Sequence, residues 1–157
     1  MTYQGIIFDF NGVLLWDSQW HQQAWRVMSA ELRGHPLTAR EMLSLMGRGT
    51  TDWLQYIVKS DISEERIVAL TLRKEELYRS IALAHPKEFC LSLGAKELLD
   101  WLKQKNIPRA IATSSEITNL EFYFKYFHLE QWFDRALVAY DDGKISCKPC
   151  PALYLRA

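Results

Sequence analysis

The stretch that decides the fold is GIIFDFNGVLL, residues Gly5 to Leu15. Its continuous apolar start predicts a short, fully buried strand over residues 5–9, because a strand covered on both faces need not alternate polar and apolar residues. Asn11 and Gly12 then predict a turn. One acid, Asp9, is therefore expected at the carboxyl end of a buried strand, where parallel sheets bind their ligands.

The block that follows this strand, residues 16–85, has the spacing of helices. Apolar residues recur at every third or fourth position in several runs, and Ser63 is a suitable N-cap for the longest of them. Thr38 and Glu41 have the spacing of a capping box. We expect about four helices in this block, with His85-Pro86 ending the last one.

The second half of the chain alternates between helix and strand patterns. Such alternation predicts βαβ units and a parallel sheet. The fold class is therefore α/β, and the helical block is an insertion after the first strand. The predicted domains are a core of residues 1–15 and 86–157, with three strands present, and an inserted helical cap of residues 16–85. The expected elements after the block are a helix near 95–102, a strand within 107–115, a helix over 117–127, a strand over 135–140 and a final helix beginning near the end of the chain.

Composition excludes several classes of function. The 157 residues carry 19 Lys plus Arg and 19 Asp plus Glu, so no net field attracts nucleic acid or an anionic membrane. The chain lacks an apolar run of the roughly 20 residues that a bilayer requires, and its start has no signal-peptide pattern. We expect a cytoplasmic protein, and the odd count of three Cys suits a reducing compartment.

Polar side chains follow each of the three predicted strands. They are Asp9 after the first, Thr113 and Ser114 at the end of the second, and Lys148 after the third. Because parallel strands end at one edge, these groups should form an anion site. A carboxylate there can attack phosphorus, while hydroxyl groups and a lysine hold the phosphoryl oxygens. Mg²⁺ would offset the repulsion between the carboxylate and the phosphate.

Three stretches of this chain resemble the motifs of one enzyme family. FDFNGVLLWDSQWHQQAW, IATSS and CKPCPALYL are similar to motifs one, two and three of the haloacid dehalogenase (HAD) superfamily, in particular its β-phosphoglucomutase-like and phosphoglycolate-phosphatase-like branch. The resemblance implies a Rossmann-like core with a helical cap, and hydrolysis of a small phosphorylated metabolite, such as a sugar phosphate, through an aspartyl-phosphate intermediate. A phosphomutase, or a phosphonate or haloacid hydrolase, is a further alternative.

The resemblance also implies a role for each matched residue. Asp9 would be the nucleophile and a Mg²⁺ ligand, and the backbone carbonyl of Asn11 would be a second ligand. Thr113, Ser114 and Lys148 would bind the phosphate, with Lys148 also bridging to Asp9. The cap would contribute three residues that contact the substrate: His21, Arg48 and Lys74.

The cap residues also have readings that involve no substrate. Lys74 lies on an apolar stripe between Leu70 and Leu77, so its ammonium group either reaches the surface beside the stripe or points into a cleft. His21 heads another apolar stripe and could equally be a packed, hydrogen-bonded histidine. Arg48, between two glycines, could be a plain surface charge.

Asn11 departs from the family motif, which usually reads Asp-x-Asp. In the family the second Asp protonates the leaving group and later deprotonates water, and an amide does neither near neutral pH. Loss of a general acid–base costs on the order of 10²–10⁴-fold in rate. Asn11 thus indicates a poor phosphatase, an altered chemistry or an inactivated site, and changing it to Asp should raise activity only if the metal site is complete.

A second departure is that the family's fourth motif, the acids that complete the Mg²⁺ site, is expected beyond Lys148 and is not found before Ala157. We therefore expect a truncated chain with weak Mg²⁺ binding and little turnover. Without the further core strands, residues 5–9 would form an apolar sheet edge that favours self-association.

The sequence leaves two competing functions open, a redox function and phosphate binding without catalysis. Cys147 and Cys150 form a C-x-P-C pair, which resembles a thioredoxin-type redox motif. The thioredoxin-type motif follows an early strand, however, whereas this pair lies at the far end of the sequence. Asn11 and the missing acids also fit a catalytically inactive, phosphate-binding or regulatory protein. Such a protein would bind its ligand without Mg²⁺-dependent turnover.

Overall fold

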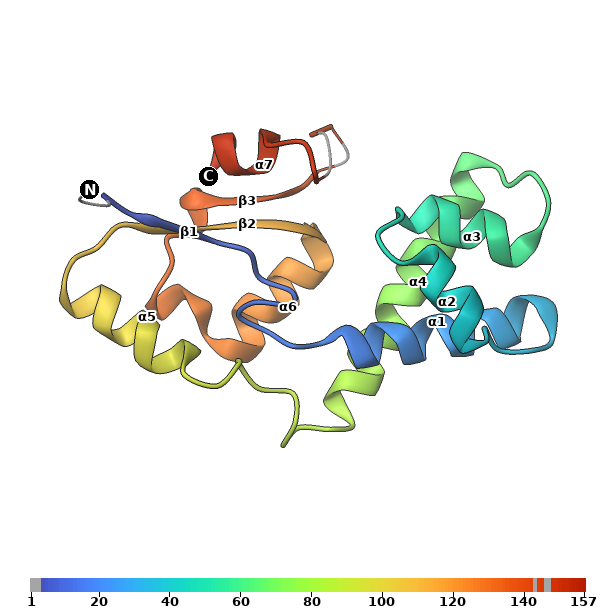
Figure 1. The fold of residues 1–157 in the computed structure, drawn as a ribbon, viewed down its shortest axis with the longest axis horizontal. Helices are drawn as coiled ribbons and strands as arrows, with labels where there is room; N and C mark the ends of the chain where they lie inside the picture. The colour runs from blue at the N-terminus through green and yellow to red at the C-terminus, as the bar shows by residue number, and fades with distance from the viewer. Residues whose placement is uncertain (1–3, 143, 146–147) are drawn as a thin grey trace. The chain divides into compact units, whose positions relative to one another are not determined.

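A computed structural model describes residues 4–142, 144–145 and 148–157. The chain divides into two compact units, each described here by itself. The sheet unit comprises Met1–Asp17 and Cys90–Ala157, and the helical unit comprises Ser18–Phe89. The predicted α/β class, with a block of helices inserted after the first strand, is confirmed (Figure 1).

The sheet unit is built on a parallel sheet in the order β1-β2-β3. Helices α5 and α6 lie on one side of this sheet and the short helix α7 on the other (Figure 1). All three strands therefore end at the same edge, as the alternating pattern predicts. The bounds are β1 Ile6–Phe8, α5 Ala95–Gln104, β2 Arg109–Glu116, α6 Ile117–Phe127, β3 Val138–Asp141 and α7 Ala152–Arg156.

Strand β1 corrects one expectation, since it is not fully buried. Phe8 is buried, but the side chain of Ile7 is 42% exposed. The reason is its place in the sheet: β1 pairs only with β2 among the described strands, so one of its edges and part of one face lack a covering element. The prediction that these residues form a sheet edge is correct for the described residues, and the self-association drawn from it stays a prediction.

Strand β3 is shorter than predicted. Residues Arg135–Leu137 form a turn of 3₁₀ helix, and the carboxylate of Asp134 caps it by accepting the backbone N–H of Ala136 at 2.9 Å. The apolar run over 135–140 conceals this turn, because a short 3₁₀ segment and a strand can carry the same residues.

The helical unit contains the four expected helices. They are α1 Ser18–Arg33, α2 Ala39–Leu45, α3 Thr50–Val58 and α4 Glu64–Leu83. Helix α1 packs against α3 and α4, and the indole rings of Trp25 and Trp53 stack with centroids 4.9 Å apart in the core of this unit. None of the described helices is long and apolar enough to cross a lipid bilayer.

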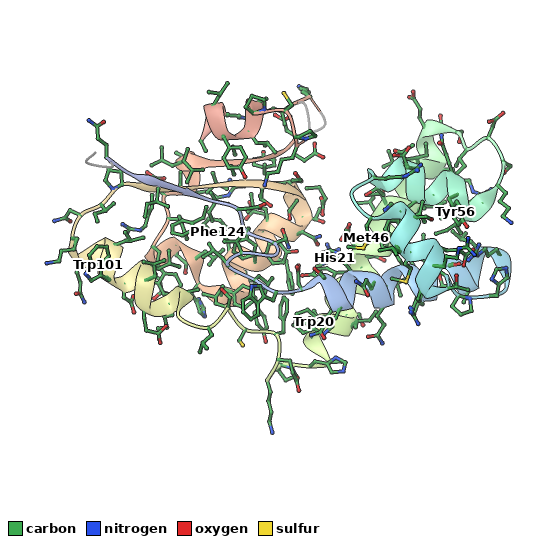
Figure 2. All side chains as sticks on the ribbon, in the orientation of Figure 1. Trp20, His21, Met46, Tyr56, Trp101 and Phe124 are labelled. Atoms are coloured by element: carbon green, nitrogen blue, oxygen red, sulfur yellow. The ribbon has the colours of Figure 1, made fainter. Side chains whose placement is uncertain are left out.

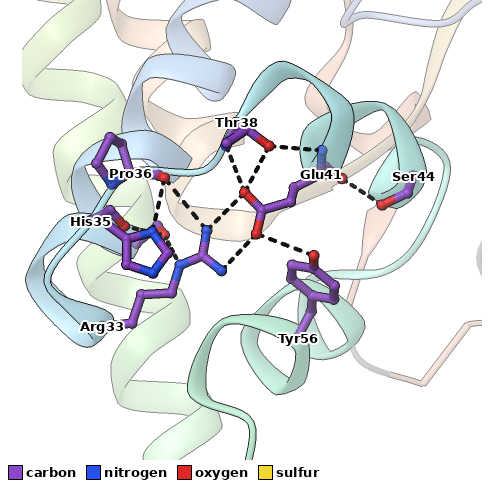
Figure 3. A network of polar contacts seen from close by, with 8 residues as sticks. Arg33, His35, Pro36, Thr38, Glu41, Ser44 and Tyr56 are labelled. Atoms are coloured by element: carbon purple, nitrogen blue, oxygen red, sulfur yellow. Dashed lines mark hydrogen bonds and ion pairs between the residues drawn. The ribbon is translucent and has the colours of Figure 1, made fainter.

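A polar network fixes the start of α2 against the end of α1 (Figure 3). Thr38 and Glu41 form the predicted capping box, with the Thr38 backbone N–H donating to Glu41 Oε2 at 2.7 Å. The guanidinium of Arg33 donates to both Glu41 carboxylate oxygens at 2.8 and 3.1 Å, and Tyr56 donates at 3.2 Å. Arg33 first, and then Thr38, hold the pKa of Glu41 well below its usual range.

This lowered pKa makes a testable contribution to the pH dependence of stability. Since the folded state favours the ionised carboxylate, the contribution is present above the ordinary glutamate pKa of about 4.3 and is lost as the pH falls below it. We expect Glu41→Gln to lower the urea midpoint at about pH 7 and to differ less from the parent at about pH 3. Exposed Glu76 provides the control: Glu76→Gln should change the midpoint little, and an equal loss at both pH values for Glu41→Gln would contradict the assignment.

Candidate active site

The structure brings Asp9 and Lys148 into contact at the carboxyl edge of the sheet. Lys148 Nζ lies 2.6 Å from Asp9 Oδ2, and the two side chains keep 23% and 31% of their surface exposed, respectively. Lys148 also donates to the backbone carbonyl of Ala112 in β2, at 3.0 Å. The ammonium group is thereby held between the first and second strands, and the pair remains open to a ligand.

The carboxylate of Asp9 is oriented on both of its oxygens. Oδ2 faces Lys148, while Oδ1 accepts the backbone N–H of Phe10 at 2.8 Å. Phe10 is fully buried and stacks on Tyr123 of α6, with ring centroids 4.7 Å apart. The packing of Phe10 thus holds the backbone after β1 in place, and this fixes the orientation of the Asp9 side chain.

The turn after Phe10 places Asn11 beside the strand ends. The Phe10 carbonyl accepts backbone N–H groups from Val13, Leu14 and Leu15, as in a single helical turn. Gly12 has a φ of +79°, a conformation that L residues with a Cβ adopt reluctantly. Its N–H donates to the Leu15 carbonyl at 2.7 Å, which closes the turn.

The side-chain amide of Asn11 is hydrogen-bonded on every side. Nδ2 donates to Asp17 Oδ2 at 2.5 Å and to the Tyr123 hydroxyl at 3.1 Å. Oδ1 accepts the hydroxyl groups of Ser115, at 2.6 Å, and Thr113, at 3.3 Å. The Asn11 side chain therefore faces β2 and α6, and it takes no part in the contact between Asp9 and Lys148.

The hydroxyl groups of the predicted phosphate-binding pair have different surroundings. Thr113 is buried, and its Oγ1 donates to Asn11 while it accepts the backbone N–H of Ser115 at 3.1 Å. Ser114 is exposed at the same strand end. Of the two, Ser114 is the one whose hydroxyl is accessible to an incoming anion, whereas the Thr113 hydroxyl is already committed to the protein.

The loop that carries Lys148 is fastened by Asp142. Asp142 Oδ1 accepts the backbone N–H groups of Lys144 and Ile145 at 2.9 and 3.1 Å, and Oδ2 pairs with Arg156 of α7 at 2.5 Å. Arg156 and these N–H groups lower the pKa of Asp142 to about 2. Asp142 therefore has a structural role, because it connects the backbone of the loop after β3 to Arg156 of α7.

Sequence reasoning missed three residues of this site: Asp17, Ser115 and Tyr123. Asp17 is 1% exposed and Tyr123 is fully buried, so both are polar groups that need internal partners. Tyr123 follows Leu120 by three positions on α6, a spacing that places it on the buried face. Ser115 stands next to the predicted pair, and only the observed course of β2 shows which way its hydroxyl points.

In the helical unit the structure joins His21 to Lys74. Lys74 Nζ lies 2.8 Å from His21 Nδ1, and the imidazole stacks on the ring of Tyr78 at 3.8 Å between centroids. His21 comes from the start of α1 (Figure 2), and Lys74 and Tyr78 come from α4. His21 is thus packed and hydrogen-bonded, which is one of its two expected readings, and a role toward substrate stays a prediction.

Lys74 is deeply buried, at 4% exposure. Its ammonium group forms an ion pair with Glu75, at 2.8 Å, and lies 5.4 Å from the ring centroid of Trp25. The reading in which Lys74 reaches the surface beside its stripe is therefore wrong. The sequence pattern did not predict Glu75, also buried at 6%, because Glu75 lies beside the predicted stripe, whose Ile67, Leu70 and Leu77 pack against the core of the helical unit.

Arg48 is not brought together with these residues by any contact of its side chain. It is exposed between Gly47 and Gly49, where Gly49 is the N-cap of α3. Its backbone N–H donates to the Leu45 carbonyl at 3.1 Å, and its side chain makes no hydrogen bond or ion pair within the described residues. The structure is consistent with a surface charge, and a role for Arg48 toward substrate stays a prediction.

The residues at the sheet edge fit a resident Mg²⁺ poorly. No group of three or more His, Cys, Asp or Glu side chains that could hold a metal occurs in the part of the chain that the structure describes. Asp9 is the acidic metal ligand predicted from the sequence, and one of its oxygens already faces the Lys148 ammonium group. Mg²⁺ takes oxygen ligands in near-octahedral geometry, of which water and a substrate phosphate supply several, so Asp9 and the Asn11 carbonyl are few protein ligands for it.

The redox alternative is only partly visible. Cys147 lies outside the described residues, and Cys150 is a half-buried, unbridged cysteine. The segment that contains Cys150 is accounted for by the position of Lys148, so the structure adds no support for thiol chemistry.

Comparison with known proteins decides the family. A family model described as haloacid dehalogenase-like hydrolase matches residues 3–157. The chain belongs to the haloacid dehalogenase-like hydrolases. The predicted resemblance is therefore confirmed, and the parallel sheet with Asp9 and Lys148 at its carboxyl edge is the HAD-like core of this chain.

Individual relatives agree with this HAD-like assignment. The chain is 31% identical over 158 residues to the fructose-1-phosphate phosphatase YqaB of Escherichia coli, covering 98% of this chain and 77% of that protein. It is 35% identical to a HAD hydrolase of family IA, variant 3, from Entamoeba histolytica, with a TM-score of 0.91 over 99% of this chain and 69% of that one. It is 25% identical to a β-phosphoglucomutase from Clostridium difficile, with a TM-score of 0.77 over 99% and 69% of the two chains.

Proposed function

We propose that this chain is a HAD-like phosphatase that hydrolyses a small phosphorylated sugar through an aspartyl-phosphate intermediate. The observation that carries the proposal is the contact between Asp9 and Lys148 at the carboxyl edge of the sheet, beside exposed Ser114. The similarity of this chain to a fructose-1-phosphate phosphatase supports a sugar phosphate as the substrate class.

The proposed reaction begins at the Asp9 carboxylate. One of its oxygens forms a bond to phosphorus while the bond from phosphorus to the sugar oxygen breaks, and the electron pair leaves with that oxygen. Lys148, 2.6 Å from Asp9, offsets the charge that gathers on the carboxylate and the phosphoryl oxygens. The Ser114 hydroxyl donates to a phosphoryl oxygen. A water molecule then attacks phosphorus while the bond between phosphorus and the Asp9 oxygen breaks. The water loses its proton to solvent, inorganic phosphate is released, and the Asp9 carboxylate is restored.

Proton transfer is the weak step of this site. The leaving sugar oxygen must gain a proton, and Asn11 has no acidic proton to give. Solvent therefore has to supply it, and the rate should fall by the 10²–10⁴-fold or so that a missing general acid–base costs. We propose slow turnover for this chain, with Mg²⁺ bound weakly at best.

The helical unit is proposed to act as the cap, contributing the substrate contacts predicted for His21, Lys74 and Arg48. Lys74 and Glu75 form a buried ion pair, and half-buried His21 contacts the Lys74 ammonium group. A cationic group held in this way has a fixed direction, which suits the recognition of an anionic or hydroxyl-rich ligand better than a mobile surface lysine does.

A second candidate function is phosphate binding without turnover. The observation that favours it is the Asn11 amide, which makes four hydrogen bonds to protein groups and replaces the acid of the family motif. In this reading Lys148 and Ser114 still hold an anion, and no reaction follows.

One assay separates the two candidates. Fructose 1-phosphate, other sugar monophosphates and p-nitrophenyl phosphate are each incubated with the protein, with and without Mg²⁺, and released inorganic phosphate is measured. We expect slow release that exceeds the release by protein lacking the Asp9 carboxylate. If the parent and that blank release phosphate equally, the enzyme proposal fails, and calorimetric titration with inorganic phosphate then tests the binding candidate.

A further inference from the structure

The hydrogen bonds of Asn11 connect three segments that are distant in sequence. Asp17 follows the turn, Thr113 and Ser115 belong to β2, and Tyr123 belongs to α6. Asp17, Thr113 and Tyr123 each have at most 1% of their surface exposed. The amide thus sits among buried polar groups, which must be hydrogen-bonded to be tolerated.

The donors and acceptors around this amide match an asparagine atom by atom. Its Nδ2 carries two hydrogens and meets two acceptors, a carboxylate oxygen of Asp17 and the Tyr123 oxygen. Its Oδ1 has two lone pairs and meets two hydroxyl donors, from Thr113 and Ser115. An amide fills each of these positions, and the orientation of the carboxamide is fixed by them.

An aspartate at position 11 would not match. It would place a carboxylate oxygen where Nδ2 stands, 2.5 Å from a carboxylate oxygen of Asp17. Two carboxylate oxygens would then face each other in a buried setting, where they repel each other and no hydrogen bond joins them, which is costly. The residue at position 11 is therefore coupled to the residue at position 17.

We propose that Asp17 and Tyr123 are positioning residues that select and orient the amide of Asn11, and that this amide in turn holds the Thr113 and Ser115 hydroxyls. The consequence for the site, which rests on the proposed phosphatase function, is that the second motif presents Ser114 to the phosphate while its neighbours stay attached to Asn11. Asn11 is then a matched part of this network rather than only a lost acid.

The test is a cycle of the variants Asn11→Asp, Asp17→Asn and the double variant. We expect Asn11→Asp to lower the thermal midpoint by roughly 5–10 °C, because acceptor meets acceptor. In the double variant the amide at position 17 can donate to the carboxylate at position 11, so more than half of this loss should be recovered. An unchanged midpoint for Asn11→Asp, or no recovery in the double variant, overturns the proposal.

A second measurement covers the case in which Asn11→Asp does not fold. In protein labelled with ¹⁵N-asparagine, the side-chain NH₂ resonances of Asn11 report its partners directly. Tyr123→Phe and Asp17→Asn should each shift these resonances, and the parent should show two well-separated proton signals. Identical resonances in parent and both variants overturn the proposal.

The same proteins are also assayed for phosphate release and for binding of inorganic phosphate. A parent that neither releases nor binds phosphate rejects the proposed function, while the thermal cycle and the resonances still decide the match between Asn11, Asp17 and Tyr123. The two failures are thereby told apart.

Discussion

Phosphate release should disappear in Asp9→Asn, the largest effect expected on activity. The carboxamide keeps the shape of the side chain but is a very poor nucleophile, and the Lys148 ammonium loses the anion that it contacts at 2.6 Å. Loss of a nucleophile that forms a covalent intermediate lowers turnover by a factor on the order of 10³ or more. Since the parent is expected to be slow, release by the variant should equal the protein-free blank.

The control for Asp9→Asn is Asp134→Asn, the same change at an exposed acid that caps a 3₁₀ turn elsewhere in the sheet unit. An asparagine can still cap, so this variant should keep both the thermal midpoint and the rate of the parent. Equal residual activity in Asp9→Asn and the parent, from separately purified samples, would remove Asp9 from the reaction and point to a contaminating phosphatase.

Glu75→Ala should produce the largest loss of stability, about 3–5 kcal/mol in the free energy of unfolding. Glu75 and Lys74 form an ion pair at 2.8 Å, with side chains only 8% and 6% exposed, respectively. Removing the carboxylate leaves the ammonium group buried with His21 and the aromatic faces of Trp25 and Tyr78 as its remaining neighbours. Urea unfolding followed by tryptophan fluorescence measures the loss.

The neighbouring acid provides the matched control. Glu76 is 61% exposed and lies 3.9 Å from Arg73 on the same helix, so Glu76→Ala should cost only about 0–1 kcal/mol. The double variant Lys74→Met/Glu75→Leu removes both charges and should restore most of the stability, because apolar groups of similar volume avoid the cost of dehydrating the ions. Equal losses for Glu75→Ala and Glu76→Ala would show that the buried pair has no special role.

The sequence carries enough information to bring Asp9 and Lys148 together, and the reason is geometric. A parallel sheet brings every strand end to one edge, so Asp9 and Lys148 meet although most of the chain separates them. It also identifies Lys74 as a lysine in an apolar setting, because helical periodicity alone shows which face a residue occupies.

The partners of these residues could not be predicted in the same way. Glu75 is adjacent to Lys74 in sequence and is rotated by about 100° around the helix axis, so periodicity places it off the stripe. The Asn11 network depends on the course of a turn and on side chains from β2 and α6, and residue spacing says nothing about which way a hydroxyl or a carboxylate points. The exposure of Ile7 in β1 likewise depends on what lies beside the strand.

The division of the sheet unit into two separate pieces of chain has a consequence for the order of events during synthesis. Ile6 pairs with Arg109, so β1, which is made before the helical unit, obtains this partner only after the whole helical unit has been made. The helical unit is continuous and can fold while the nascent chain is still growing, as domains generally do. Until Arg109–Glu116 emerges, the strand that leads to Asp9 is an apolar segment without its β2 partner, and this interval is when the growing polypeptide most needs protection by a chaperone.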